Sequence, residues 1–212
     1  MLQASRIVVK SIACSTMLLA AACGGSERTQ TETAAQSSAQ GAPAQSVTEK
    51  PFGAGGRIEL QLEAGKYTVR AARDSMIRVT LGANDGSPKV DISTQDMRAG
   101  VVVKETPRKN FEATIEVPPT ADLVIRLTAG DLTVEAITGN KDVESNAGNV
   151  DIVTGDATDY SSVDVSVRAG DIKADPFGGS RSGLLQTFTW SGKGKYAVRA
   201  RLIAGNLTLR SR

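Results

Sequence analysis

The sequence predicts an all-β protein whose main part is a β-solenoid-like repeat domain of parallel coils. From Phe52 onward, apolar and polar residues alternate with a period of two, which is typical of strands with one buried face. A short Ala-Gly-Asp/Asn unit recurs between the apolar runs, and helical spacing is nowhere sustained. We therefore expect one domain over residues 52–212, preceded by two segments of other kinds.

Residues 1–22 have the features of a secretory signal peptide, with basic residues first and an uncharged stretch after them. The ending Leu18-Leu19-Ala20-Ala21-Ala22-Cys23 resembles the lipobox of bacterial lipoproteins. The resemblance implies cleavage between Ala22 and Cys23, acylation of Cys23 and anchoring in membrane lipid, which several acyl chains make stable. In that family an aspartate after the cysteine marks the inner membrane, so Gly24 favours the outer membrane. An ordinary cleaved signal is the alternative.

Residues 23–51 are predicted to be a disordered linker between this anchor and the domain. They are rich in Gln, Ser, Thr, Ala and Gly and contain no aromatic residue before Phe52. Such a segment buries too little apolar surface to offset the entropy lost on ordering.

The composition excludes several function classes. Loss of the signal removes Arg6 and Lys10 and leaves 23 basic and 23 acidic residues, so net charge does not favour nucleic acid. The chain has no histidine, and its only cysteines are Cys14 and Cys23. Catalytic triads with histidine, His- or Cys-ligated metal sites and disulfides are therefore excluded. We expect a protein that is not an enzyme and has no cofactor.

The first part of the domain, residues 52–118, shows strand patterns without regular repeats. It is expected to form a β cap that ends at Pro118-Pro119, because proline cannot donate within a central strand. The following repeats are clearer, and Gly130, Gly148 and Gly170 are 18 and then 22 residues apart. Glycine permits positive φ at a bend, and Asp or Asn can bond nearby backbone. The predicted structural turn residues are Gly130, Asp131, Gly148, Asn149, Gly170, Asp171, Gly205 and Asn206.

Periodicity leaves an alternative open, because Gly-Asp and Gly-Asn also suit two-residue hairpins. These would give an antiparallel β-sandwich in which Leu127 faces Val134 across the turn at Gly130. The regular spacing favours parallel coils over about residues 120–175.

Some side chains of the domain could carry chemistry. Aspartates at the repeat turns could bind calcium, but the calcium-binding nonapeptide is absent, so turn capping is favoured and no metal site is predicted. Phe188 and Trp190 share one strand face and are expected in the core or as a cap. Arginines alternate with apolar residues, and pairing with acids on neighbouring strands is favoured over a basic binding face. These arginines are Arg70, Arg73, Arg78, Arg98, Arg126, Arg168, Arg199 and Arg201.

The stretches FEATIEVPPTADLVIRLTAGDLTVEAITGN and GKGKYAVRARLIAGNLTLRSR resemble the "putative adhesin" family of bacterial cell-envelope proteins, which is akin to auto-transporter adhesin head domains. The resemblance covers residues 52–212. It implies a β-rich repeat domain and supplies no catalytic residue.

The leading hypothesis is a non-enzymatic, lipid-anchored cell-envelope protein whose strand faces bind a polymer or a protein. One alternative is a periplasmic structural or assembly factor of the envelope. Another is a histidine-free polysaccharide hydrolase or lyase, which would need two carboxylates facing each other across a cleft.

Overall fold

Fourteen strands and two short 3-10 turns make up the part of the chain that the structure describes, residues 46–82 and 86–211. The structure is a computed structural model, and these residues lie in one compact unit, Gly41–Arg212. Within the described ranges there is no α-helix, so the all-β prediction is confirmed. These residues contain no helix long and apolar enough to cross a membrane. The predicted signal and Cys23 lie outside the described residues.

The elements follow the chain in a simple order. They are β1 (Ser46–Pro51), β2 (Arg57–Leu62), β3 (Gly65–Ala71), β4 (Met76–Leu81), β5 (Lys89–Gln95), β6 (Arg98–Lys104), β7 (Glu112–Val117), β8 (Asp122–Val134), β9 (Lys141–Ala147), β10 (Val150–Val153), η1 (Ala157–Asp159), β11 (Tyr160–Ala174), η2 (Asp175–Phe177), β12 (Gly179–Ser191), β13 (Tyr196–Ala204) and β14 (Leu207–Arg210).

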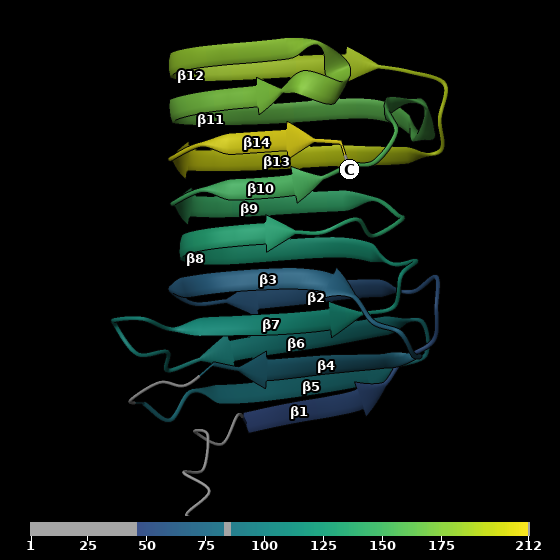
Figure 1. Cartoon of the computed structure of the whole chain (residues 1–212), viewed down its shortest axis with the longest axis vertical. Coiled ribbons are helices and arrows are strands. Elements are labelled where there is room, and N and C mark those ends of the chain that lie inside the picture. Colours follow the sequence, from purple (N-terminus) through teal and green to yellow (C-terminus); the bar gives the residue numbers. More distant parts are fainter. Residues whose placement is uncertain (1–45, 83–85, 212) are drawn as a thin grey trace, which may run out of the picture. The chain divides into compact units, whose positions relative to one another are not determined.

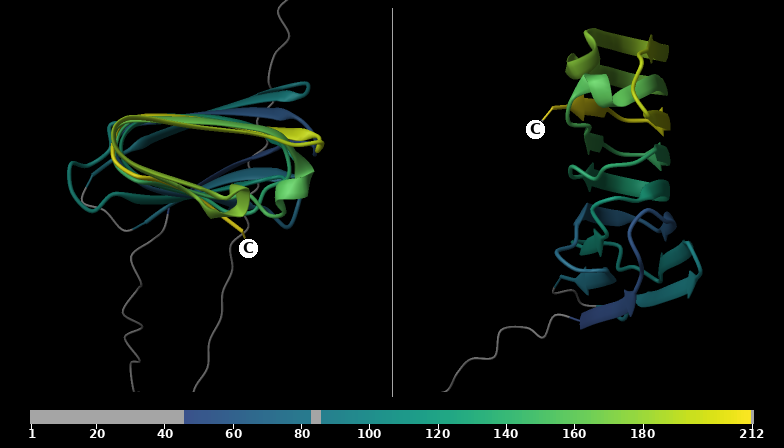
Figure 2. Two further views of the ribbon diagram at one scale, coloured as in Figure 1. Left: turned by 90° about the horizontal axis from the view of Figure 1, so that it is seen from above. Right: turned by 90° about the vertical axis from the view of Figure 1, so that its right-hand side faces the viewer.

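The strands form two facing layers (Figure 2). The buried apolar side chains of the core lie between them. Layer 1 contains β6, β2, the first half of β8, β9, β13 and the first half of β11, and all its neighbours are parallel. Layer 2 contains β7, β3, the second half of β8, β10, β14 and the second half of β11, again all parallel. Because β8 and β11 run through both layers, six strands close into a ring in the order β8–β9–β13–β11–β14–β10.

We call each level of this stack a rung, meaning one strand of layer 1 with the strand of layer 2 beside it. The rungs follow in the order β6–β7, β2–β3, β8, β9–β10, β13–β14 and β11 (Figure 1). This is not the order of the chain. The β2–β3 rung comes first in the chain but lies between β6–β7 and β8. The β13–β14 rung comes last in the chain but lies between β9–β10 and β11.

Antiparallel strands complete both ends of the stack. β12 pairs with β11 at one end. At the other end β5 pairs with β6, β4 with β7, and β1 with β4.

Three expectations from the sequence need correction. Residues 52–118 are not a separate cap, because β2, β3, β6 and β7 form two parallel rungs of the stack. The hairpin at Gly130 is wrong, because β8 continues through this glycine and its two halves pair with different strands. The predicted linker does not extend to residue 51, because strand β1 starts at Ser46. The polar composition of these residues did not reveal the strand, since β1 is held by backbone pairing with β4, which does not depend on apolar side chains.

The core consists of inward-facing residues that repeat at the same position on each rung. One column in layer 1 contains Leu60, Ile125, Val143, Ala200 and Val165, which are all at most 1% exposed. Each large apolar side chain buried in this way contributes about 1.5–3 kcal/mol.

The β12 end of the core is closed by aromatic side chains. Phe188 is buried, and the ring of Trp190 lies 5.0 Å from that of Phe177. Phe188 and Trp190 therefore belong to the core and its cap, in agreement with the favoured interpretation of the sequence.

A column of glycines lies where the chain passes from layer 1 to layer 2. A Cβ atom on Gly148 would overlap the carbonyl oxygen of Gly130, and one on Gly205 would overlap the carbonyl oxygen of Gly148. The same relation joins Gly170 to Gly205 and Gly130 to Gly65. Four of these glycines also have φ between 111° and 139°, a range that other residues avoid. They are Gly130, Gly148, Gly205 and Gly170. Glycine is therefore required both for the bend and for the close approach of the rungs.

We expect Gly148→Ala to lower the free energy of unfolding by about 3 kcal/mol or more, because it combines backbone strain with overlap against the next rung. The matched control is Gly155→Ala, where φ is +84° but nothing lies within 4 Å of the added Cβ. Urea unfolding followed by circular dichroism measures both. Equal losses in the two variants would show that the bend alone matters and that the rung contact contributes nothing.

Candidate functional site

Five threonines form a row across the outer surface of layer 2, and we call it the threonine row. Strand register places each beside the next, in the order Thr80, Thr114, Thr68, Thr133 and, beyond Asp151 of β10, Thr208. Lys173 and Ser180 continue it on β11 and β12. Neighbouring strands are about 4.8 Å apart, so the row repeats at that interval.

The local sequence explains why these side chains point outward. Each threonine of the row lies between two apolar residues, as Thr133 lies between the buried Leu132 and Val134. Since successive side chains of a strand alternate between its faces, burial of the neighbours directs the threonine to the surface. None of the five hydroxyl groups has a hydrogen-bond partner among the described residues. They are free to donate to a ligand and to accept from it.

A shallow groove of about 340 Å³ runs beside the row, and its lining includes Thr133, Thr208, Asp151 and Lys173. The carboxylate of Asp151 accepts from Arg210 Nε at 2.7 Å, so the charge in the middle of the row is paired. The groove therefore offers hydroxyl, amide and carboxylate groups, with Asp131 and Asp171 also in its lining, together with the ammonium group of Lys173.

The predicted turn residues form a hydrogen-bonded ladder along the other side of this groove. Asn149 Nδ2 donates to Asp131 Oδ1 at 2.9 Å, and Asn206 Nδ2 donates to Asn149 Oδ1 at 3.0 Å. The backbone N–H of Asp171 then donates to Asn206 Oδ1. An amide can both donate and accept, whereas an ionised carboxylate can only accept, which explains asparagine on the two inner rungs and aspartate on the outer ones.

These bonds also bear on the calcium alternative. The aspartates of the ladder are separated by asparagines, and among residues 46–82 and 86–211 no cluster of three or more carboxylates could hold a metal ion.

Several arginines of the domain form ion pairs with acidic side chains on neighbouring strands. Arg78 contacts Glu49, Asp74 and Glu116, at 2.9, 3.0 and 2.9 Å. Hydrogen bonds from Arg78, with a second contribution from Arg70, lower the pKa of Glu116. On layer 1, Glu144 lies between Arg126 and Arg201 and contacts both. Four of the eight arginines named from the sequence are thus paired with acids across strands.

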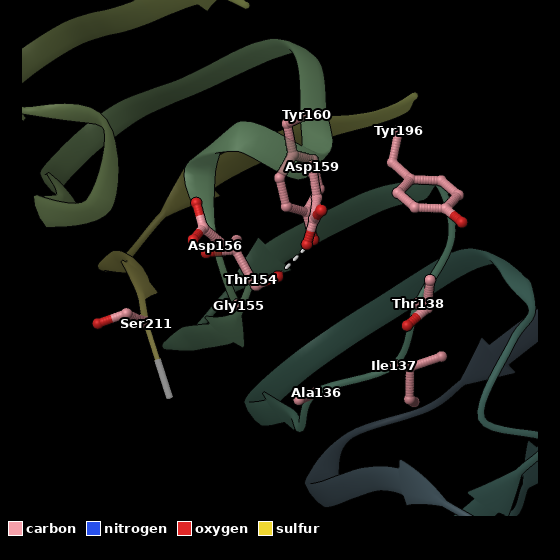
Figure 3. Close-up of a pocket in the computed structure, with 10 residues that line it drawn as sticks. All are labelled: Ala136, Ile137, Thr138, Thr154, Gly155, Asp156, Asp159, Tyr160, Tyr196 and Ser211. Carbon is pink, nitrogen blue, oxygen red and sulfur yellow. Dashed lines mark hydrogen bonds between the residues drawn. The ribbon is translucent and has the colours of Figure 1, made fainter. Parts of the chain in front are cut away.

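A second candidate site is a corner cavity of about 450 Å³ beside η1 (Figure 3). Its lining includes Asp156, Asp159, Tyr160 and Tyr196. The Tyr160 hydroxyl donates to the carbonyl oxygen of Thr154 at 2.7 Å, and burial raises the pKa of this tyrosine to about 12. Asp156 accepts from the backbone N–H and the hydroxyl of Thr158, and these bonds lower its pKa.

Lys141 lies in the core behind this cavity, at an inward position between Leu123 and Val198. It is only 2% exposed. Its ammonium donates to the carbonyl oxygens of Ile137 and Gly139, at 2.7 and 3.2 Å, and to the Tyr160 hydroxyl at 3.1 Å. Desolvation lowers the pKa of Lys141 to about 8, although the nearby charge of Asp122 acts in the opposite direction.

The bonds around the cavity fit a structural role better than a catalytic one. All three protons of the charged Lys141 are used, and Asp156 caps η1, so neither group is free to act on a ligand. Sequence reasoning missed both Lys141 and the threonine row. The row could have been found, because the polar residue inside the apolar run of the repeat is threonine after Gly130 and again after Gly205.

Comparison with known proteins gives likenesses of structure only. No protein-family model matches the chain, and no curated protein sequence matches it. A crystal structure of a putative cell adhesion protein from Clostridium sporogenes is similar at 14% identity and a TM-score of 0.48, over 80% of this chain and 100% of that one. Two proteins from Parabacteroides distasonis are similar at 9% identity over 78% of this chain. One is a putative adhesin (70% of its length, TM-score 0.28) and the other a putative lipid binding protein (73%, TM-score 0.30).

We expect the stability of the protein to rise by about 2 kcal/mol between pH 8 and pH 10 through Lys141. In this interval the unfolded lysine, with its ordinary pKa of 10.5, holds a proton that the folded one has lost. The unfolded state then binds more protons, so the free energy of unfolding increases with pH. Above pH 10 ionisation of tyrosine in the unfolded state opposes this, because the pKa of Tyr160 is raised in the folded state. Denaturant unfolding at several pH values measures the slope.

Lys141→Met is the control for this experiment, since it removes the titrating group and should abolish the rise. A variant with the same slope as the parent would assign the pH dependence to other groups.

Proposed function

We propose that this chain is a non-enzymatic, lipid-anchored protein of the bacterial cell envelope whose β-solenoid-like domain binds an envelope polysaccharide. The threonine row is the observation that carries the proposal. It presents five unpartnered hydroxyl groups on one surface beside a shallow groove, four of them on adjacent strands and the fifth beyond Asp151. A regular polymer that is rich in hydroxyl groups matches a row of this kind along its length.

The five hydroxyl groups of the threonine row have no internal partner to lose, which favours the row as the contact surface. Cross-strand ion pairs lie on both outer surfaces, around Glu144 on layer 1 and around Glu116, two residues along from the row, on layer 2. A ligand at those positions would have to displace ion pairs, whereas a ligand at the row would not. Such a broad contact without a deep pocket is consistent with adhesion and requires no catalytic group.

The proposed anchor is the acylated Cys23, and the outer membrane is its proposed location. The lipobox resemblance and Gly24 support this, and residues 24–45 would separate the anchor from β1.

Thr133→Arg should weaken binding of the full chain to its polysaccharide by at least about tenfold, because the bulky charge interrupts the row at its centre. Co-sedimentation with insoluble peptidoglycan sacculi, and with purified envelope polysaccharide of the producing bacterium, measures the affinity. The matched control is Thr128→Arg, on the same strand β8 but on layer 1. Equal binding by both variants, or no binding by the parent, would contradict the proposed face.

Cys23→Ser should move the full chain from the membrane fraction to the soluble fraction when it is expressed in its own type of cell, because acylation at this position is lost. Cys14→Ser is the control and should leave the protein in the membrane fraction. Protease treatment of intact cells, followed by detection of cleavage within residues 24–45, then tests whether the domain faces outward. Retention of the Cys23→Ser protein in the membrane would mean that something other than this lipid holds it.

A further inference from the structure

The end of the stack at β12 leaves one strand edge unpaired. β12 has 13 residues and, within the described residues, pairs only with β11 (Figure 1). Its other edge therefore presents backbone N–H and C=O groups to the surroundings. An edge of this length is a template for pairing with another strand.

The opposite end of the stack is protected in a way that β12 is not. β1 carries Glu49, Lys50 and Pro51 within six residues, and β5 carries Lys89 and Asp91. Charges and proline are the usual means by which proteins prevent edge-to-edge pairing. β12 has no proline, and its single charged residue is Arg181.

The middle of β12 is also apolar and exposed. Leu184 and Leu185 are 75% and 79% exposed, the highest fractions among the large apolar side chains of the described residues. Leu185 is the central residue of Gly179–Ser191. The strand bends at this point, with φ of 116° at Gly183 and 54° at Leu185.

We propose that β12 pairs antiparallel with β12 of a second copy of this chain, about a two-fold axis through Leu185. This axis places the two apolar midpoints against each other and one bend against the other. It sets Arg181 opposite Thr189 and Leu184 opposite Gln186, so no like charges meet. Because the apolar pair lies at the centre of the strand, a second copy complements it as a symmetric contact requires.

The resulting dimer has a defined polarity. β1 and β12 lie at opposite ends of the stack (Figure 1). Pairing through β12 therefore places the β1 strands of the two copies at the two far ends of the dimer. The contact leaves the threonine row exposed in both copies, so the inference goes beyond the proposed function and does not rest on polysaccharide binding.

A single cysteine tests this geometry directly. In the full chain, Cys14→Ser and Cys23→Ser remove every native thiol, since these are the only cysteines. Residues opposite each other in an antiparallel pair have Cα atoms about 4.5–5.5 Å apart, which a disulfide can span. Leu185→Cys in this background should therefore form a covalent dimer under mild oxidation, seen on a non-reducing gel. Ile203→Cys, on β13 and 48% exposed, is the matched control and should remain monomeric.

Sedimentation analysis of the chain without cysteines gives an independent measurement. We expect a dimer at micromolar concentration, and Leu185→Lys should weaken it by at least about tenfold while leaving the circular dichroism spectrum unchanged. A parent that stays monomeric, as it would if the edge served a different protein, overturns the proposal. A dimer that Leu185→Lys does not weaken, or equal cross-linking of Leu185→Cys and Ile203→Cys, also overturns it.

Discussion

The close contact between glycines of successive rungs is the constraint on which the other features depend. The carbonyl oxygen of one glycine occupies the place of a Cβ atom on the next, from Gly65 through Gly130, Gly148 and Gly205 to Gly170. This contact aligns the rungs at the bend, so residues at equal distance from the glycine fall into register. One residue after the glycine, register produces the ladder of aspartates and asparagines, and three residues after it, register produces the row that contains Thr133 and Thr208. The surface pattern is therefore a consequence of the bend.

The order of the rungs has consequences for how the domain assembles. β13–β14 lies between β9–β10 and β11, so β11 reaches its place in the stack only when the C-terminal strands separate it from β10. At the other end the separating rung comes first in the chain, because β2–β3 lies between the later rungs β6–β7 and β8. Most contacts therefore join residues that are far apart in the chain. Folds of this kind pay loop-closure entropy early and fold slowly.

The strands and their bends could be predicted from the sequence, because alternation and the glycine unit are local signals. The order of the rungs could not, since every unit has the same apolar-polar-apolar run and any rung could bury its face against any other. One signal for the order was present. An ionised carboxylate cannot donate to the next member of a ladder, so Asn149 and Asn206 belong on neighbouring rungs between Asp131 and Asp171. Lys141 was missed for the opposite reason. A lysine at an inward position contradicts the alternation, and only the three acceptors around its ammonium, contributed partly by Tyr160, make that position tolerable.

A stack of parallel rungs always has two ends, and this chain treats them differently. At the β1 end, charged side chains and Pro51 protect the edge. At the β12 end, Phe188 and Trp190 close the core, so the apolar interior needs no further cover, yet the backbone edge and two leucines are left exposed. At the β12 end the chain therefore covers its own core but leaves the backbone edge of β12 unprotected. An exposed edge of this kind is a template for pairing with another strand. The side of the stack and its end would then serve different contacts, the side for a polymer and the end for a second copy.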